Sequence, residues 1–254
     1  MNKAVPIIGL IIGAVVLAGA FLFVRGRQAR NDISEAENVP ELPFSQRPFT
    51  SLTPTEDGHF LNLLVENIIV EGAETAEYEL LYQVEDGRTQ GVPGVVQISP
   101  GESVRQELLL GSESSSVFRY DEGVEAGTLT LRFRDSNGKL LGRLKTDFQL
   151  VSGVRTFDAP DGSKLVNLEE PSDDFYIAMN TFGIPGNIGY PDDQVYLGPY
   201  GIFPSSSRPI NGTASPGVYY LDNGKWQFVG NSEISGLGVF LLLSPSTDAL
   251  SPER

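Results

Sequence analysis

The sequence predicts an all-β fold, with two β-sandwich-like domains behind one N-terminal transmembrane helix. Three observations predict it. An apolar run without charge occupies residues 5–24, apolar and polar residues alternate over 51–152, and residues 153–243 are rich in glycine, proline and aromatic residues with hairpin turns. The chain has no cysteine, which excludes disulfides, thiolate zinc sites and cysteine nucleophiles.

Residues 1–24 form the predicted anchor. At 1.5 Å per residue, about twenty helical residues cross roughly 30 Å of hydrocarbon, so we expect residues 5–24 to hold the protein in a membrane. Gly9 and Gly13 form a pair spaced for close helix packing. A cleaved signal peptide is the alternative, with Ala18-Gly19-Ala20 as cleavage site, but the apolar run continues to Val24 and favours a retained anchor.

The orientation of the anchor has two interpretations. Arg25, Arg27 and Arg30 follow the apolar run and only Lys3 precedes it, so a positive-inside count places the bulk of the chain in the cytoplasm. A very short N-terminal tail before a hydrophobic segment is typical of a signal anchor and favours the other side. We expect a single-pass protein with extracytoplasmic β domains, carried on a polar, proline-containing stalk over residues 25–50.

Residues 51–152 carry the clearest strand pattern. Leu129, Leu131 and Phe133 share one face, turn residues follow to Gly138, and the even-numbered residues of 140–150 point the same way. This predicts a half-buried antiparallel hairpin. Similar alternation at 61–65, 78–84 and 104–110 brings the expected count to about seven strands in about 100 residues, which is typical of an immunoglobulin-like sandwich.

Residues 153–243 are expected to form a second β-rich domain. Residues 175–179 are an apolar burst, and residues 218–221 and 226–229 flank Asn223-Gly224, a pair suited to a tight hairpin turn. Residues 239–243 are apolar on both faces, which predicts a central strand. Residues 244–254 are expected to be a flexible tail.

The segment from Pro216 to Leu243 resembles the closing part of ZU5-like β-sandwich domains of bacterial surface proteins. The matching elements are Tyr219-Tyr220, Asn223-Gly224, Trp226 and residues 237–240. The resemblance implies an extracytoplasmic structural or adhesive module. The cleavage triplet by which some of these domains cut themselves is missing, so that activity is not carried over.

Catalytic chemistry finds little support in the sequence. His59 is the only histidine, and no Gly-x-Ser-x-Gly motif surrounds any serine, so we expect no enzyme. Four carboxylates are the densest acidic cluster and are candidate calcium ligands, with solvated loop charge as the alternative: Glu169, Glu170, Asp173 and Asp174. Tyr219 and Trp226 are a candidate ligand platform, with core packing or a cross-strand pair as the alternative.

The charge balance limits the partners. The formal net charge is −15, and its excess of acidic residues lies after residue 50, which disfavours nucleic acid. We therefore expect a membrane-anchored, non-enzymatic surface or envelope protein that displays β domains in structural, adhesive or protein-interaction roles, with an unknown protein or glycan partner and no required cofactor. The alternative is a carbohydrate- or calcium-binding module on the same anchor.

Overall fold

A computed structural model describes residues 42–115, 117–159, 162, 164–186, 188–191, 196–208, 210–229 and 233–243. The predicted transmembrane helix with Gly9 and Gly13, the stalk as far as residue 41 and the tail from residue 244 lie outside these ranges. Within them, the only helical segment is the short 3₁₀ turn Phe44–Gln46, and no helix is long and apolar enough to cross a bilayer. The described part is a β protein built from antiparallel sheets, which confirms the expected class.

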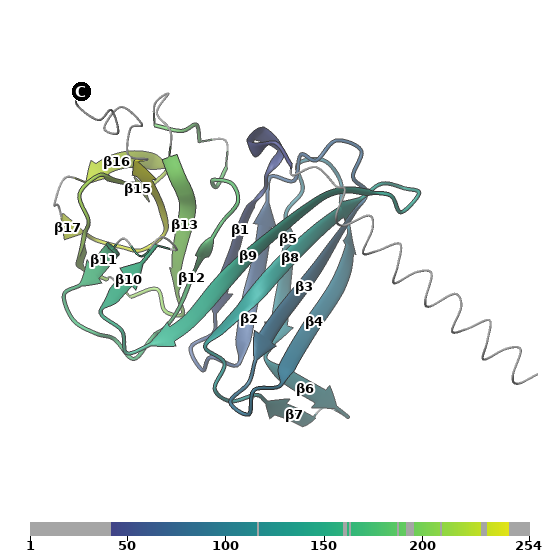
Figure 1. Cartoon of the computed structure of the whole chain (residues 1–254), viewed down its shortest axis with the longest axis horizontal. Helices are drawn as coiled ribbons and strands as arrows, with labels where there is room; N and C mark the ends of the chain where they lie inside the picture. Colours follow the sequence, from purple (N-terminus) through teal and green to yellow (C-terminus); the bar gives the residue numbers. More distant parts are fainter. Residues whose placement is uncertain are drawn as a thin grey trace, which may run out of the picture. The chain divides into compact units, whose positions relative to one another are not determined.

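A nine-stranded antiparallel sheet runs through the described part (Figure 1). From edge to edge its strands are β16 (Lys225–Val229), β15 (Val218–Asp222), β18 (Val239–Leu243), β13 (Tyr196–Pro204), β12 (Phe175–Asn180), β9 (Leu140–Ser152), β8 (Ala126–Arg134), β3 (Thr75–Gln83) and β4 (Thr89–Gln97).

Three smaller sheets complete the fold. One is β1 (Phe49–Pro54), β2 (Phe60–Glu66) and β5 (Val104–Leu109); the second is β10 (Thr156–Asp158), β11 (Lys164–Leu168), β14 (Gly212–Ala214) and β17 (Glu233–Ile234); the third is the hairpin β6 (Gly111–Ser114) and β7 (Val117–Tyr120).

Two buried cores use opposite faces of the long sheet. In β12, Ile177 and Met179 belong to the first core, which the sheet β1-β2-β5 also lines, whereas Tyr176 belongs to the second core, which β10, β11, β14 and β17 also line. Because side chains alternate along a strand, one strand can serve both cores. The domain boundary expected at residue 152 coincides with the end of β9, yet β9 pairs with β12 there, so the sheet continues across it.

The hairpin β8–β9 matches its prediction. Every even-numbered residue of β9 from Leu140 to Leu150 is buried, and Leu131 lies opposite Leu144 in the ladder. Asp135 shapes the turn, because its Oδ1 accepts hydrogen bonds from the backbone N–H groups of Asn137 (2.9 Å) and Lys139 (2.9 Å). The alternation of the sequence therefore places this strand pair correctly in register and in facing.

The C-terminal strands also match. Asn223 and Gly224 take positive φ values, 45° and 75°, as the tight turn between β15 and β16 requires. The strand β18 lies between β13 and β15, and four of its five residues are buried. A strand that is apolar on both faces is covered on both faces, which explains its interior place in the sheet.

Candidate functional site

The four predicted calcium ligands do not form a metal site. All of them are described, and no three histidine, cysteine or acidic side chains in the described part gather closely enough to hold an ion. Glu169 and Glu170 are exposed just after β11, while Asp174 accepts a hydrogen bond through Oδ2 from Ser206 Oγ (2.8 Å). The alternative interpretation, charge on solvated loops, fits this arrangement better.

Tyr219 and Trp226 lie on the same outward face of the hairpin β15–β16. Neither belongs to the second core, to which Val218 and Tyr220 contribute from the opposite face. The ring of Tyr219 packs against Phe228 at 5.0 Å between centroids, and Trp226 Nε1 donates to the carbonyl of Gly189 (2.7 Å). Phe228 is 55% exposed. The pair is thus part of an outward aromatic surface on an edge hairpin.

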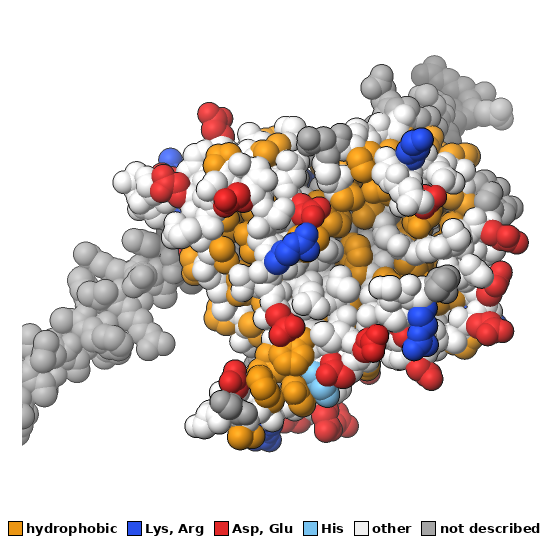
Figure 2. Space-filling model, turned by 180° about the vertical axis from the view of Figure 1, so that it is seen from behind, with side chains coloured by type: hydrophobic (Ala, Val, Ile, Leu, Met, Phe, Trp, Pro, Cys, Tyr) orange, Lys and Arg blue, Asp and Glu red, His pale blue; other side chains and the backbone are white. Residues whose placement is uncertain are grey.

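A second aromatic surface, which the sequence did not single out, lies around the hairpin β6–β7. We call it the tip patch; it consists of His59, Phe60, Phe118 and Tyr120. Figure 2 shows hydrophobic side chains gathered beside the histidine of this protein, with acidic side chains close by. Phe118 is 45% exposed and Tyr120 38% exposed, so the two rings form a contiguous apolar patch open to solvent.

The rings of the tip patch pack on one another. Phe118 and Tyr120 point to the same side of β7, and their rings are nearly parallel, with 2° between planes and 6.1 Å between centroids. His59 stacks on Tyr120 at 3.8 Å, and Phe60 meets both Phe118 and Tyr120 edge-on at 6.1 Å. Such parallel and edge-to-face contacts hold exposed rings in place.

Backbone hydrogen bonds tie the hairpin to the segments before β2 and after β5. Leu110 N donates to the carbonyl of His59 (2.9 Å), and Asp121 N donates to the carbonyl of Leu110 (2.9 Å). The buried Tyr82 donates through its hydroxyl to Asp121 Oδ2 (2.9 Å). A Cβ atom at Gly111 would collide with the carbonyl oxygen of Arg119, so glycine is needed there for β7 to approach. These contacts therefore fix the position of the hairpin β6–β7, which carries Phe118 and Tyr120 of the tip patch.

The surroundings of the tip patch are acidic. Five carboxylates flank its residues in the chain or in the ladder, against the exposed cation Arg119: Glu56, Asp57, Glu113, Asp121 and Glu122. Asp57 also fixes the loop, because Thr55 Oγ1 and the backbone N–H of His59 donate to its Oδ1. These two hydrogen bonds, the one from Thr55 first, hold the pKa of the Asp57 carboxyl below its usual value, so it stays charged.

Comparison with protein families, with curated proteins and with solved structures finds no match for this chain. The resemblance of residues 216–243 to ZU5-like domains therefore stays a prediction. The function has to be argued from the surfaces of the molecule alone.

Proposed function

We propose that this chain is a membrane-anchored, non-enzymatic protein that displays its β domains outside the cytoplasm and binds a partner protein through the tip patch. The observation that carries the proposal is the exposed, mutually packed ring cluster of Phe118, Tyr120, Phe60 and His59. Aromatic side chains that are exposed and already ordered lose little conformational entropy on binding, and they are enriched where proteins meet.

The position of the tip patch suits display. The described chain begins at Leu42, whose side chain lies against Gly142 near the turn between β8 and β9. The hairpin β6–β7 follows β5 and precedes β8 at the other end of these strands. At about 3.3 Å per residue, β8 separates the two ends by roughly 26 Å. The tip patch therefore lies at the end of these strands opposite Leu42.

The acidic surroundings define the partner's chemistry. Carboxylates next to exposed rings attract a segment that carries lysine or arginine, because the cation can meet both the charges and the ring faces. The partner is therefore a protein with a basic surface segment. Binding to such a partner should weaken as salt is raised.

The sandwich itself fits this use. Strand order β1-β2-β5 in one sheet, facing β4-β3-β8-β9 within the long sheet, supports an immunoglobulin-like sandwich, in which hairpins and loops gather at the two ends. We take the region of the first core to be such a domain. In this architecture the ends are the usual places for recognition.

Photocrosslinking in cells tests the tip patch. The full chain carries p-benzoylphenylalanine in place of Phe118, and the matched control carries it in place of Phe228, another exposed phenylalanine. We expect a discrete protein adduct from position 118 that weakens at high salt and when Glu56 and Glu122 are changed to glutamine. An adduct from position 228 alone, or none from 118, would overturn the proposal.

Protease accessibility tests the side of the membrane. In intact cells, with any outer barrier opened, we expect the β region to be digested while a cytoplasmic control protein survives. Protection that ends only when the inner membrane is lysed would make the protein a cytoplasmic scaffold on a membrane anchor.

A carbohydrate-binding role is the second candidate, and the outward row of Tyr219, Trp226 and Phe228 favours it, since sugars stack on exposed rings. A glycan array probed with the full chain tests this role. If a glycan signal is lost in Phe228→Ala and retained in Phe118→Ala, the binding function belongs to the hairpin β15–β16 and not to the tip patch.

A further inference from the structure

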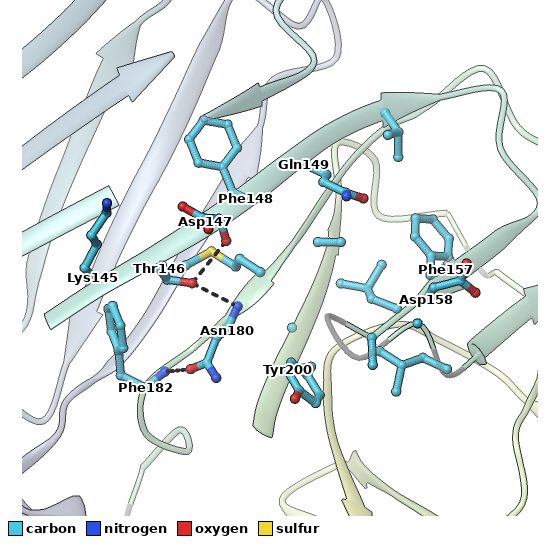
Figure 3. Close-up of a pocket in the computed structure, with 18 of the residues that line it drawn as sticks. Lys145, Thr146, Asp147, Phe148, Gln149, Phe157, Asp158, Asn180, Phe182 and Tyr200 are labelled. Carbon is cyan, nitrogen blue, oxygen red and sulfur yellow. Dashed lines mark hydrogen bonds between the residues drawn. The ribbon is translucent and has the colours of Figure 1, made fainter. Parts of the chain in front are cut away.

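A groove of about 910 Å³ lies on the long sheet, next to β10 and away from the tip patch. Its volume is within the range of small-molecule sites, roughly 300–1,000 Å³. Figure 3 looks into it and shows Gln149, Asn180 and Tyr200 projecting from the neighbouring strands β9, β12 and β13, with Phe157 of β10 across from them. The long sheet therefore forms the floor of the groove.

The chemistry of the groove changes along β9. Because side chains alternate, the odd-numbered residues of β9 line it, with two cations first, then a carboxylate, an amide and an apolar side chain: Arg143, Lys145, Asp147, Gln149 and Val151. At about 3.3 Å per residue, Lys145 and Val151 lie roughly 20 Å apart along the strand.

The apolar end is enclosed by both sheets. Val151 of β9 is joined there by the buried residues Ile202 of β13, Phe157 of β10 and Leu165 of β11. These side chains belong to the second core or pack against it, so their positions are fixed before any ligand arrives. The partly exposed Val151, Val154 and Ala178 lie over these buried residues and are the apolar surface that a ligand chain would contact.

The cationic end lacks countercharges of its own. Among the described residues, neither Arg143 nor Lys145 forms an ion pair, and Arg143 Nε is buried without an acceptor. On the adjacent strand β8, in contrast, Arg132 pairs with Glu79 (2.9 Å) and Arg134 with Glu77 (2.7 Å). Since neither side chain is paired with a carboxylate, an anion at this end would be their countercharge.

Two carboxylates also line the groove, Asp147 and Asp158, and they offset part of this charge without forming an ion pair with Arg143 or Lys145. The carboxylate of Asp147 accepts a hydrogen bond from Thr128 Oγ1 (3.0 Å) on β8, on the side away from β12. Asn180 accepts one through Oδ1 from the backbone N–H of Phe182 (2.8 Å), so its amide N–H groups remain for a ligand. Asp158 lies on β10, across the groove from β9 (Figure 3).

We propose that the groove binds a small amphiphile, with its apolar chain at Val151, Val154 and Ala178 and a single anionic head group at Arg143 and Lys145. The two cations at one end form no ion pair, and the carboxylates Asp147 and Asp158 lie further along the groove, so an anionic head group is favoured at that end. This site is separate from the tip patch, and neither proposal depends on the other.

Thiol protection tests the site, and the absence of any other cysteine makes the label specific. The full chain carries Ala178→Cys in the groove floor, and a matched control carries Val95→Cys at an exposed position on β4. Each is labelled with a water-soluble maleimide in the presence of dodecanoate or of dodecyltrimethylammonium, which share the chain length and differ in charge. We expect dodecanoate to slow labelling at position 178 about fivefold, with little effect from the cation and none at position 95.

Charge variants complete the test. In Arg143→Gln/Lys145→Gln the dodecanoate protection at position 178 should disappear, whereas Lys139→Gln, which removes a cation from the β8–β9 turn, should leave it intact. Equal protection by both amphiphiles, protection at position 95 as well, no protection at all, or protection that survives in the double variant would each overturn the proposal.

Discussion

Two hairpins of this protein, β8–β9 and β6–β7, use aromatic residues in opposite ways. In β8–β9, Phe133 and Phe148 are essentially inaccessible to solvent and lie in the first core. In β6–β7, Phe118 and Tyr120 remain exposed, packed mainly on one another and on His59 and Phe60. The first hairpin stabilises the fold, and we propose that the second recognises a partner. Rings of the same kind thus serve stability or binding according to what covers them.

The largest expected effect is at the buried hairpin. Phe133→Ala should lower the free energy of unfolding by about 3–5 kcal/mol, because it removes a buried ring and leaves a cavity. Urea unfolding of the full chain measures this loss. Phe133→Leu is the control and should recover most of it; equal losses in both variants would show that the cavity is not the cause.

Gly111→Ala should disturb the hairpin β6–β7 and leave the buried hairpin β8–β9 intact. The added methyl group meets the backbone of Arg119, so β7 must move and the tip patch loses its geometry, while both cores keep every buried side chain. We expect crosslinking from position 118 to be lost with the global free energy of unfolding lowered by no more than about 1 kcal/mol. Gly189→Ala, which adds a methyl group in open space, serves as control. Retained crosslinking in Gly111→Ala would contradict this role of the hairpin.

Tyr82 links the hairpin to the core through a pH-sensitive contact. Burial, and then the hydrogen bond to the Asp121 carboxylate, raise the pKa of the Tyr82 hydroxyl well above its usual value. A raised pKa contributes stability that is present below the unfolded value of about 10 and is lost as pH rises beyond it. Unfolding measured between pH 9 and pH 11 should show this decline, and Tyr82→Phe should reduce its slope. An unchanged slope would exclude Tyr82 as a source of the decline.

The smallest effect concerns the ion pairs on the outer face of the sheet. Arg132 and Glu79 lie 2.9 Å apart with side chains about a quarter to a third exposed, so we expect a coupling energy of about 0.5 kcal/mol that shrinks in salt. A double-mutant cycle with Arg132→Gln and Glu79→Gln measures the coupling. A value above about 2 kcal/mol would show that this face is more shielded from solvent than its exposure indicates.

The contrast between the hairpins also explains what the sequence could predict. Alternation indicates a strand with one buried face and predicts β8 and β9 correctly, the Asn223-Gly224 turn predicts β15 and β16, and the unbroken apolar run predicts β18. The hairpin β6–β7 buries neither face and has no such signature. Only the β-prone run Val117-Phe118-Arg119-Tyr120, bounded by serines and acidic residues, could have pointed to it.

The sites depend on pairings that local patterns do not contain. His59 reaches Tyr120 only because β2 pairs with β5 and the hairpin folds back from the end of β5. The groove exists because β9 pairs with β12 and the chain returns through β10 beside them. Conversely, the carboxylates from Glu169 to Asp174 are close in sequence and still form no metal site, since proximity along the chain does not aim side chains at one point.

The most direct test of the central claim is the free energy of unfolding of the full chain carrying Phe118→Ala and Tyr120→Ala together. If these exposed rings serve recognition and not folding, the double variant should lie within about 1 kcal/mol of the unmodified protein. A loss of about 3–5 kcal/mol, as expected for Phe133→Ala, would contradict the account, because the tip patch would then be a third hydrophobic core and not a docking surface.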